Sequence, residues 1–103
     1  MSRVISLDMI VRVVADDFDV SKIAIMSPRR DADAVLARHV CMWIARRVTA
    51  LSFPQIGRYF SDRDHSSVMH ACQSIDRKMP ADGALAQRVM DLMDALSEGM
   101  AAP

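Results

Sequence analysis

Cysteine is scarce in this sequence, and long apolar runs are absent. Only two cysteines, Cys41 and Cys72, occur in 103 residues, and each lies inside an apolar helical pattern. They are therefore expected to be small hydrophobic residues of a reducing compartment rather than a disulfide. No run of about eighteen apolar residues occurs, which argues against a membrane span, and the N-terminus lacks the features of a signal peptide. These absences favour a cytoplasmic protein.

The sequence also lacks the motifs of nucleotide hydrolysis, metal binding and triad catalysis. It contains no Gly-x-x-x-x-Gly-Lys-Ser/Thr loop, so it cannot hydrolyse ATP by that route. No Cys-x-x-Cys or His-x-x-x-His pair is present, and His70 and Cys72 do not face each other at a helical spacing of two. Asp64, His65 and Ser66 are consecutive and cannot converge as a catalytic triad. We therefore predict that the protein is not an enzyme and needs neither a cofactor nor a metal.

Aromatic residues are few, whereas methionine is abundant. The chain has three phenylalanines, one tyrosine and one tryptophan, against nine methionines. Because methionine is unbranched and fills irregular gaps, this composition predicts a core filled by flexible thioethers. The length of 103 residues suits a single small domain spanning residues 1–103.

Charge is segregated along the chain, although the formal net charge is zero. Residues 27–50 carry five arginines against two aspartates, a net charge of +3. Residues 80–103 carry one arginine against four acidic residues, a net charge of −3. This arrangement favours a basic surface that faces phosphates and an acidic tail directed elsewhere. Two ordinary solvated faces are the alternative.

The hydrophobic periodicity predicts an all-α fold with short connectors. Ser6 is the expected cap of the first helix, and Ser52 with Gln55 forms a capping box before a short helix. Arg38, Arg46 and Arg47 are expected on or beside the polar face of the longest helix. The expected helices span residues 7–18, 33–50, 53–60, 64–78 and 84–98, with one helical turn at residues 21–25, breaks at residues 27–30 and at Pro80 and Gly83, and a frayed end at residues 99–103.

The most informative segment is IGRYFSDRDHSSVMHA, residues 56–71. Ile56 and Phe60 share one helix face, and Gly57 between them leaves room for a crossing helix or a close backbone. A polar connector follows, and Asp64 can accept from the free backbone N–H groups of the next helix. This order of elements is typical of a helix-turn-helix unit.

The helix that begins after Asp64 has one apolar and one polar face. Its apolar stripe predicts burial against the rest of the domain. The polar face offers short hydrogen-bonding groups in the first turns, where a recognition helix meets base edges in the major groove. The apolar stripe consists of Val68, Cys72, Ile75 and Met79, and the polar face of His65, Ser66, Ser67, His70, Gln73 and Arg77. An ordinary polar helix start is the alternative interpretation.

This segment resembles the signature of the DNA-binding C-terminal domain of the bacterial chromosomal replication initiator DnaA. The signature reads Ile-Gly-x-x-Phe, two variable residues, Arg-Asp-His, two Thr or Ser, Val, one apolar residue and His-Ala, and every fixed position is matched here. Residues 36–57 also resemble the long and short helices that precede the signature. The similarity covers about residues 5–79. It implies a small helical domain with a helix-turn-helix unit, similar to the DnaA C-terminal domain and to Trp repressor.

The resemblance also implies a role for each residue of the DNA-binding surface. Arg30 stands where the family sends an arginine into the minor groove. Arg38 and Arg46 match positions that grip phosphate, and Phe53 and Pro54 match positions that touch thymine methyl groups. Asp64 corresponds to a residue that accepts from a cytosine amino group. The remaining base and phosphate contacts fall on His65, Ser66, Ser67 and His70.

The sequence departs from the family at several of these positions. Ser66 and Ser67 stand where the family commonly has threonine, so two methyl groups are absent. The family is also richer in basic residues where this chain has Asp31, Ala32, Asp33 and Leu36. Fewer cations near the phosphates predict weaker binding with a flatter salt dependence.

The expected partner is double-stranded DNA at DnaA-box-like sites, in chromosomal replication initiation or its regulation. Because the nucleotide-binding loop is absent, the chain is either a domain of a larger initiator or a free-standing relative. We expect it in the cytoplasm, associated with the nucleoid. The alternative is a protein-interaction module that keeps the fold and contacts a replication initiator or one of its regulators.

Overall fold

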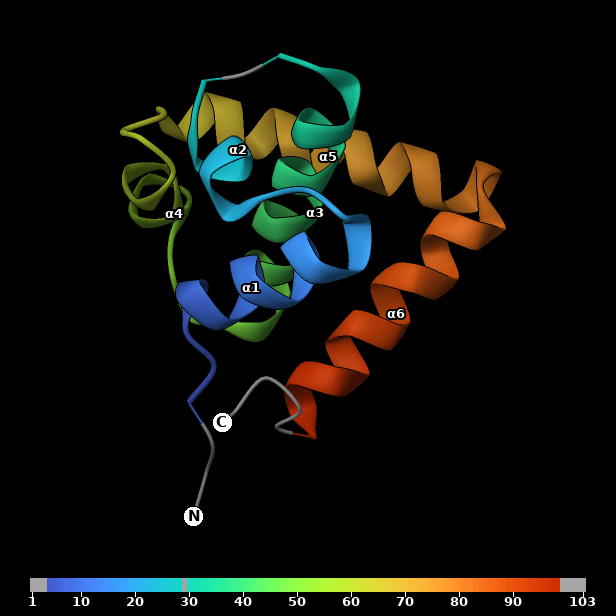
Figure 1. Cartoon of the computed structure of the whole chain (residues 1–103). Coiled ribbons are helices and arrows are strands. Elements are labelled where there is room, and N and C mark those ends of the chain that lie inside the picture. Colours follow the sequence, from blue (N-terminus) through green and yellow to red (C-terminus); the bar gives the residue numbers. More distant parts are fainter. Residues whose placement is uncertain (1–3, 29, 99–103) are drawn as a thin grey trace.

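A computed structural model describes residues 4–28 and 30–98 of the chain, and their regular structure is entirely α-helical (Figure 1). The predicted all-α fold is therefore confirmed. Within this part of the chain, none of the helices has both the length and the apolar character needed to cross a membrane. The helices are α1 (Leu7–Phe18), α2 (Lys22–Met26), α3 (Ala32–Val48), α4 (Phe53–Tyr59), α5 (His65–Ala81) and α6 (Gly83–Ser97).

Every helix begins after a residue whose side chain accepts from a backbone N–H group of the first turn. Ser6 accepts from Met9, as predicted. The predicted capping box is present in α4, because Ser52 and Gln55 each accept from the backbone of the other. Such caps satisfy donors that have no partner within the helix, which explains why the short polar connectors end where they do. The N-caps are Ser6, Ser21, Asp31, Ser52, Asp64 and Asp82.

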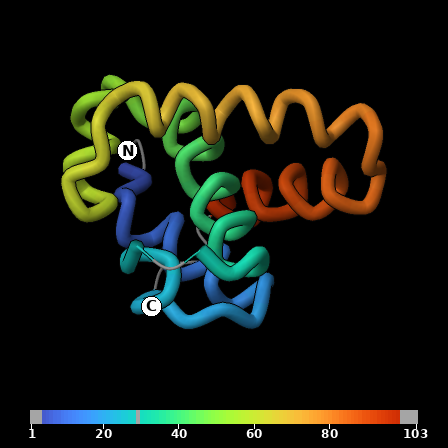
Figure 2. The backbone as a smooth tube through the Cα atoms, turned by 90° about the horizontal axis from the view of Figure 1, so that it is seen from above, coloured from blue at the N-terminus to red at the C-terminus, as the bar shows by residue number. Residues whose placement is uncertain are grey.

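Helix α3 lies at the centre of the molecule (Figure 1). It packs against α1 and α5, and also contacts α2, α4 and α6. Helices α5 and α6 are joined by a sharp turn, and from there α6 runs back at an angle to α5 and also contacts α1 and α3 (Figures 1 and 2). The start of α5 lies at the opposite end of this helix, near α4 (Figure 1).

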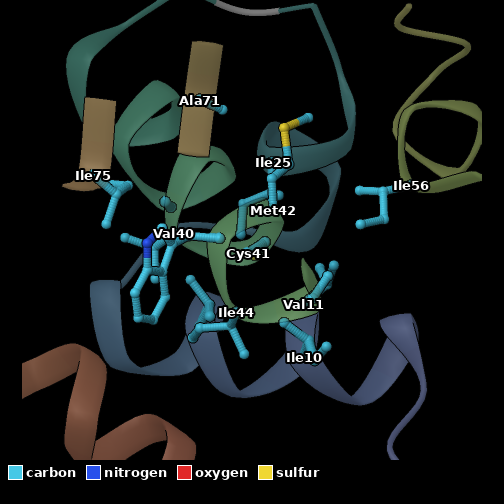
Figure 3. Packing of buried hydrophobic residues seen from close by; sticks show 14 of the residues in the cluster. Ile10, Val11, Ile25, Val40, Cys41, Met42, Ile44, Ile56, Ala71 and Ile75 are labelled. Carbon is cyan, nitrogen blue, oxygen red and sulfur yellow. The ribbon is translucent and has the colours of Figure 1, made fainter. Parts of the chain in front are cut away.

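The core is built from branched aliphatic side chains around α3 (Figure 3). Ile10 and Val11 of α1 lie toward Ile44 of α3, and Ile75 of α5 covers the opposite side of α3. The prediction of a methionine-filled core is wrong for the described residues. Met42 is the one methionine there that is fully buried, because the helix stripes that meet at α3 present mainly Ile, Val, Leu and Ala.

Two helix boundaries correct the expectations. Helix α3 ends at Val48 rather than at Ala50. Helix α5 continues through Pro80 to Ala81 and α6 begins at Gly83, so neither residue is a break, and the chain turns at Asp82 alone. A proline in the last turn removes only one backbone hydrogen bond, and the Asp82 N–H then donates to the Met79 carbonyl oxygen at 3.3 Å. The helix therefore tolerates the ring near its end.

Candidate nucleic-acid interface

The turn between α4 and α5 is fixed by a close backbone approach. The Arg63 N–H donates to the Gly57 carbonyl oxygen at 2.9 Å. A Cβ atom at Gly57 would lie 2.1 Å from the Arg63 carbonyl oxygen, so only glycine fits there. Ser61 and Asp62 adopt left-handed conformations, with φ of 60° and 54°. Of the two predicted roles of Gly57, the close approach of another backbone segment is the one observed.

Asp64 caps α5, as predicted. Its Oδ1 atom accepts from the Ser67 N–H at 2.9 Å. This backbone hydrogen bond is the main reason why the pKa of Asp64 lies below its ordinary value. The carboxylate is solvent-exposed and stays ionised, so it is an acceptor at the tip of the helix. A carboxylate has further lone pairs and can accept a second donor while it caps.

Helix α5 divides into the two predicted faces. Val68, Ala71, Cys72 and Ile75 are buried, and Met79 is half-buried. Burial raises the pKa of the Cys72 thiol, and that of Cys41 even more, so both are protonated hydrophobic residues. Both cysteines are free thiols. The predicted polar residues are all exposed: His65, Ser66, Ser67, His70, Gln73 and Arg77.

Arg46 and Phe53 form a pair beside α5. The Arg46 guanidinium lies 4.6 Å from the centre of the Phe53 ring, and its Nη1 donates to the Leu51 carbonyl oxygen at 3.0 Å. Arg46 is nevertheless exposed. Phe53 is half-buried and Pro54 is exposed in the first turn of α4. The structure thus brings together a held cation and two apolar surfaces at the start of α4.

Arg30 lies on the surface, in the loop between α2 and α3. We call Ser27, Pro28, Arg30 and Asp31 the Arg30 loop. The loop is next to the turn before α5, because the Ser61 hydroxyl donates to the Met26 carbonyl oxygen and Arg63 donates to the Ser27 carbonyl oxygen at 3.2 Å. Arg30 is therefore placed on the same side of the molecule as the start of α5.

Arg38 is not on a polar face, which corrects the expectation for this residue. Its side chain is only 4% exposed. The guanidinium donates to the carbonyl oxygens of Ile25 at 2.7 Å, Ala24 at 3.1 Å and Ser27 at 2.7 Å. These carbonyls belong to the C-terminal end of α2, where the helix dipole is negative. Arg38 thus holds α2 against α3 instead of projecting toward solvent.

Two residues of this region, His39 and Arg63, were missed by the sequence-based assignment. His39 Nδ1 and Arg63 Nε are buried and have no hydrogen-bond partner among the described residues. Burial, with the nearby charge of Lys78, lowers the pKa of His39 to about 4. Both side chains line a hollow of about 250 Å³ beside the first turns of α5. Arg63 was detectable, because it is the arginine of the Arg-Asp-His signature.

The hollow concentrates positive charge and hydrogen-bond donors. It is lined by Arg38, His39, Met42, Arg63, Ser67 and His70. The charge of Arg63 also contributes, after burial, to lowering the pKa of Arg38. The two guanidinium groups donate to the same neutral acceptor, the Ser27 carbonyl oxygen. Such an arrangement favours an anionic oxygen.

A short helix, a tight turn and a second helix with an exposed polar start define a helix-turn-helix protein. The sequence matches the family described as "Bacterial dnaA protein helix-turn-helix" over residues 7–75. The chain belongs to this family.

Relatives in several bacteria support the assignment. The chromosomal replication initiator protein DnaA of Xanthobacter autotrophicus is 42% identical over 85 residues, covering 82% of this chain and 17% of that protein. The protein of the same name from Oenococcus oeni is 40% identical over 96 residues, covering 93% of this chain and 21% of that protein. The chain thus spans about a fifth of the length of these relatives.

Proposed function

We propose that this chain binds double-stranded DNA sequence-specifically at DnaA-box-like sites, in chromosomal replication initiation or its regulation. One observation carries the proposal: the first turns of α5 follow a tight, well-defined turn and expose a row of polar groups beside Met69, while the apolar face of the helix is anchored in the core. A rigidly held helix with a polar tip is what major-groove readout needs. Relatives that share this domain are named as replication initiators.

In this proposal the tip of α5 reads bases. Asp64 accepts from a cytosine amino group while its other lone pairs cap the helix. His65, Ser66, Ser67 and His70 make the remaining base and phosphate contacts of α5. The hydroxyl groups of the two serines are adaptable donors and acceptors, so they fit either a base edge or a phosphate oxygen.

The neighbouring elements hold the backbone of the duplex. Arg46 contacts phosphate, and its stack on Phe53 restricts the guanidinium before DNA arrives. Phe53 and Pro54 offer apolar atoms to thymine methyl groups. Arg38 contributes charge rather than a direct contact, because its donors are used on α2.

Arg30 completes the surface as a minor-groove reader. Arg30 is exposed in a loop that is bonded at Ser27 to the turn before α5, and in this proposal one duplex meets α5 in the major groove and Arg30 in the adjacent minor groove. A narrow minor groove has an enhanced negative potential that attracts arginine. This contact adds sequence preference at positions that α5 does not touch.

The test is fluorescence anisotropy of the chain with a DnaA-box duplex and with a scrambled duplex of equal length, at near-physiological salt. We expect tighter binding to the box, by a factor that grows when salt weakens nonspecific contacts. Equal affinity for the two duplexes would overturn the proposal. The fold would then be serving protein interaction, with a replication initiator or one of its regulators as the partner.

A second measurement tests the phosphate role of Arg46. Arg46→Ala should weaken binding to box and scrambled duplexes alike and lower the salt slope by about one unit. Arg12→Ala is the control, because Arg12 is an exposed arginine of α1 that is paired with Asp8 at 2.8 Å. A loss confined to the box duplex would contradict a phosphate contact.

A further inference from the structure

The Ser27 carbonyl oxygen is the point where three parts of the molecule meet. Ser27 ends α2 and begins the Arg30 loop. Its oxygen accepts from Arg38 Nη2 at 2.7 Å, which comes from α3, and from Arg63 Nη2 at 3.2 Å, which comes from the turn before α5. One backbone atom therefore links the loop, the central helix and the recognition turn.

Two further contacts reinforce this link. The Ser61 hydroxyl, in the same turn, donates to the Met26 carbonyl oxygen. Arg38 donates to Ala24 and Ile25, which are the preceding carbonyls of α2. Helix α2 has no basic residue in its own last turn, and donors from α3 and from the turn before α5 reach its last carbonyl oxygens in addition to the local donors of Ser27.

The direction of the Arg63 side chain is set by the same backbone that orients α5. The Arg63 N–H is bonded to Gly57, and the two residues before it are left-handed. The next residue, Asp64, caps α5. A movement of Arg63 would therefore move the cap, and a movement of the Arg30 loop would pull on Arg63.

We propose that Arg63 is a positioning residue for DNA recognition: it fixes the Arg30 loop relative to the start of α5. The major-groove and minor-groove contacts then meet the duplex in one register without reordering the loop on binding. This inference rests on the proposed function. Its rival is that Arg63 itself binds a phosphate, since its buried Nε has no partner among the described residues.

A double-mutant cycle separates the two roles. Arg63→Met removes the donors and keeps the length of the side chain, and Arg30→Ala removes the minor-groove contact. If Arg63 acts through the Arg30 loop, Arg63→Met should weaken box binding roughly tenfold in the parent chain, and less than about twofold in the Arg30→Ala background. Equal losses in both backgrounds, with a salt slope lowered by about one unit, would overturn the inference in favour of a direct phosphate contact.

Arg58→Met is the matched control, because Arg58 is an exposed arginine of α4 in the same helix-turn-helix unit. Its effect should be the same in both backgrounds. Ser61→Ala is a milder variant that removes only the side-chain hydrogen bond to the Met26 carbonyl oxygen. It provides a second test of the inference if Arg63→Met does not fold. It should lower box affinity a few-fold in the parent chain and have no effect when Arg30 is absent. No loss in the parent chain would overturn the inference.

NMR of the free protein gives a readout that does not depend on DNA. Arg63→Met should shift or broaden the amide resonances of Arg30 and Asp31, whereas Arg58→Met should leave them in place. Unchanged resonances would overturn the inference even if binding weakened. A parent chain that bound box and scrambled duplexes equally would instead refute the proposed function. In that case the amide resonances alone would test whether Arg63 fixes the Arg30 loop relative to the turn before α5.

Discussion

The two ends of α5 are built in different ways. At its start, the chain passes through a turn with two left-handed residues, a backbone contact to Gly57 and the Asp64 cap. At its end, the single residue Asp82 serves both helices: its N–H donates to Met79 of α5, and its side chain accepts from the Leu85 N–H of α6. Nothing lies within 4 Å of a Cβ atom placed on Gly83.

This difference shows at which end of α5 the position of the backbone is fixed most tightly. The start of α5 is determined by several contacts that agree on one geometry, and that end carries the proposed base-reading groups. The far end needs only a short connection that lets α6 return along the core. Strict local geometry is thus concentrated where small displacements of side chains would disturb recognition.

Substitution of the two glycines should give the largest contrast. Gly57→Ala should destabilise the fold by about 3 kcal/mol or more, because its Cβ meets a backbone oxygen that cannot yield cheaply. Gly83→Ala should change stability by no more than about 0.5 kcal/mol. Urea unfolding of both variants measures this, and similar losses would refute the contrast between the two ends.

Removing one arginine beside the start of α5 and one near its far end should separate sequence-specific recognition from a general effect of positive charge on binding. Arg30→Ala should leave the melting temperature almost unchanged and reduce box binding roughly tenfold or more. Arg77→Ala, an exposed arginine toward the far end of α5, should reduce box binding less and without regard to sequence. Anisotropy and thermal melts on the same preparations provide the comparison. An Arg30→Ala protein that melts early, or binds the box like its parent, would show that the minor-groove assignment is mistaken.

The two aspartate caps offer a subtler comparison. Asp64→Ala and Asp82→Ala should each lower the melting temperature by about 4–8 °C, since each removes one cap. Only Asp64→Ala should also relax the preference at one base pair, by roughly tenfold. Binding to a set of single-substitution duplexes measures this, and a matching change in Asp82→Ala would mean that the preference depends on stability alone.

The hollow beside the start of α5 should make stability depend on pH. The unfolded chain binds a proton at histidine below about pH 6.5, whereas His39 in the folded protein binds one only near pH 4. Unfolding therefore takes up a proton between these values, and stability falls as the pH falls. After a discount for partial solvent access, we expect a loss of about 1 kcal/mol between pH 7 and pH 5.

His39→Gln should abolish that part of the pH dependence, and His65→Gln, at an exposed position on α5, should retain it. Urea unfolding at the two pH values is the measurement. An unchanged slope in His39→Gln would place the titrating group elsewhere.

Features of the fold that depend on local sequence were predictable. The caps at Ser6, Ser52 and Asp64 follow from spacings of three residues, and the place of Gly57 in the turn follows from the signature. Such interactions involve neighbours along the chain, so a single sequence contains them in full.

Features of the fold that depend on partners distant along the chain could not be predicted from the sequence. Arg38 is buried because carbonyl groups 11 to 14 residues earlier receive its donors, and helical periodicity carries no sign of them. The hollow with His39 and Arg63 exists only once α3 and α5 are packed. Helix α5 tolerates Pro80 because this residue lies in its last turn, and the sequence alone does not show where the helix ends. The residues proposed to contact DNA remain predictions from the resemblance.

Trp43 is the only tryptophan of the chain and is 5% exposed. Its indole Nε1 donates to Asp76 Oδ1 at 2.8 Å, and the Arg47 guanidinium lies 4.5 Å from the ring centre. The ring also lines a hollow of about 300 Å³ together with Arg46 and Phe53. The protein therefore carries a built-in fluorophore between its interior and the proposed DNA surface. Unfolding would shift the emission to longer wavelength, whereas a duplex that neutralises the adjacent arginines would change its intensity with the indole still enclosed.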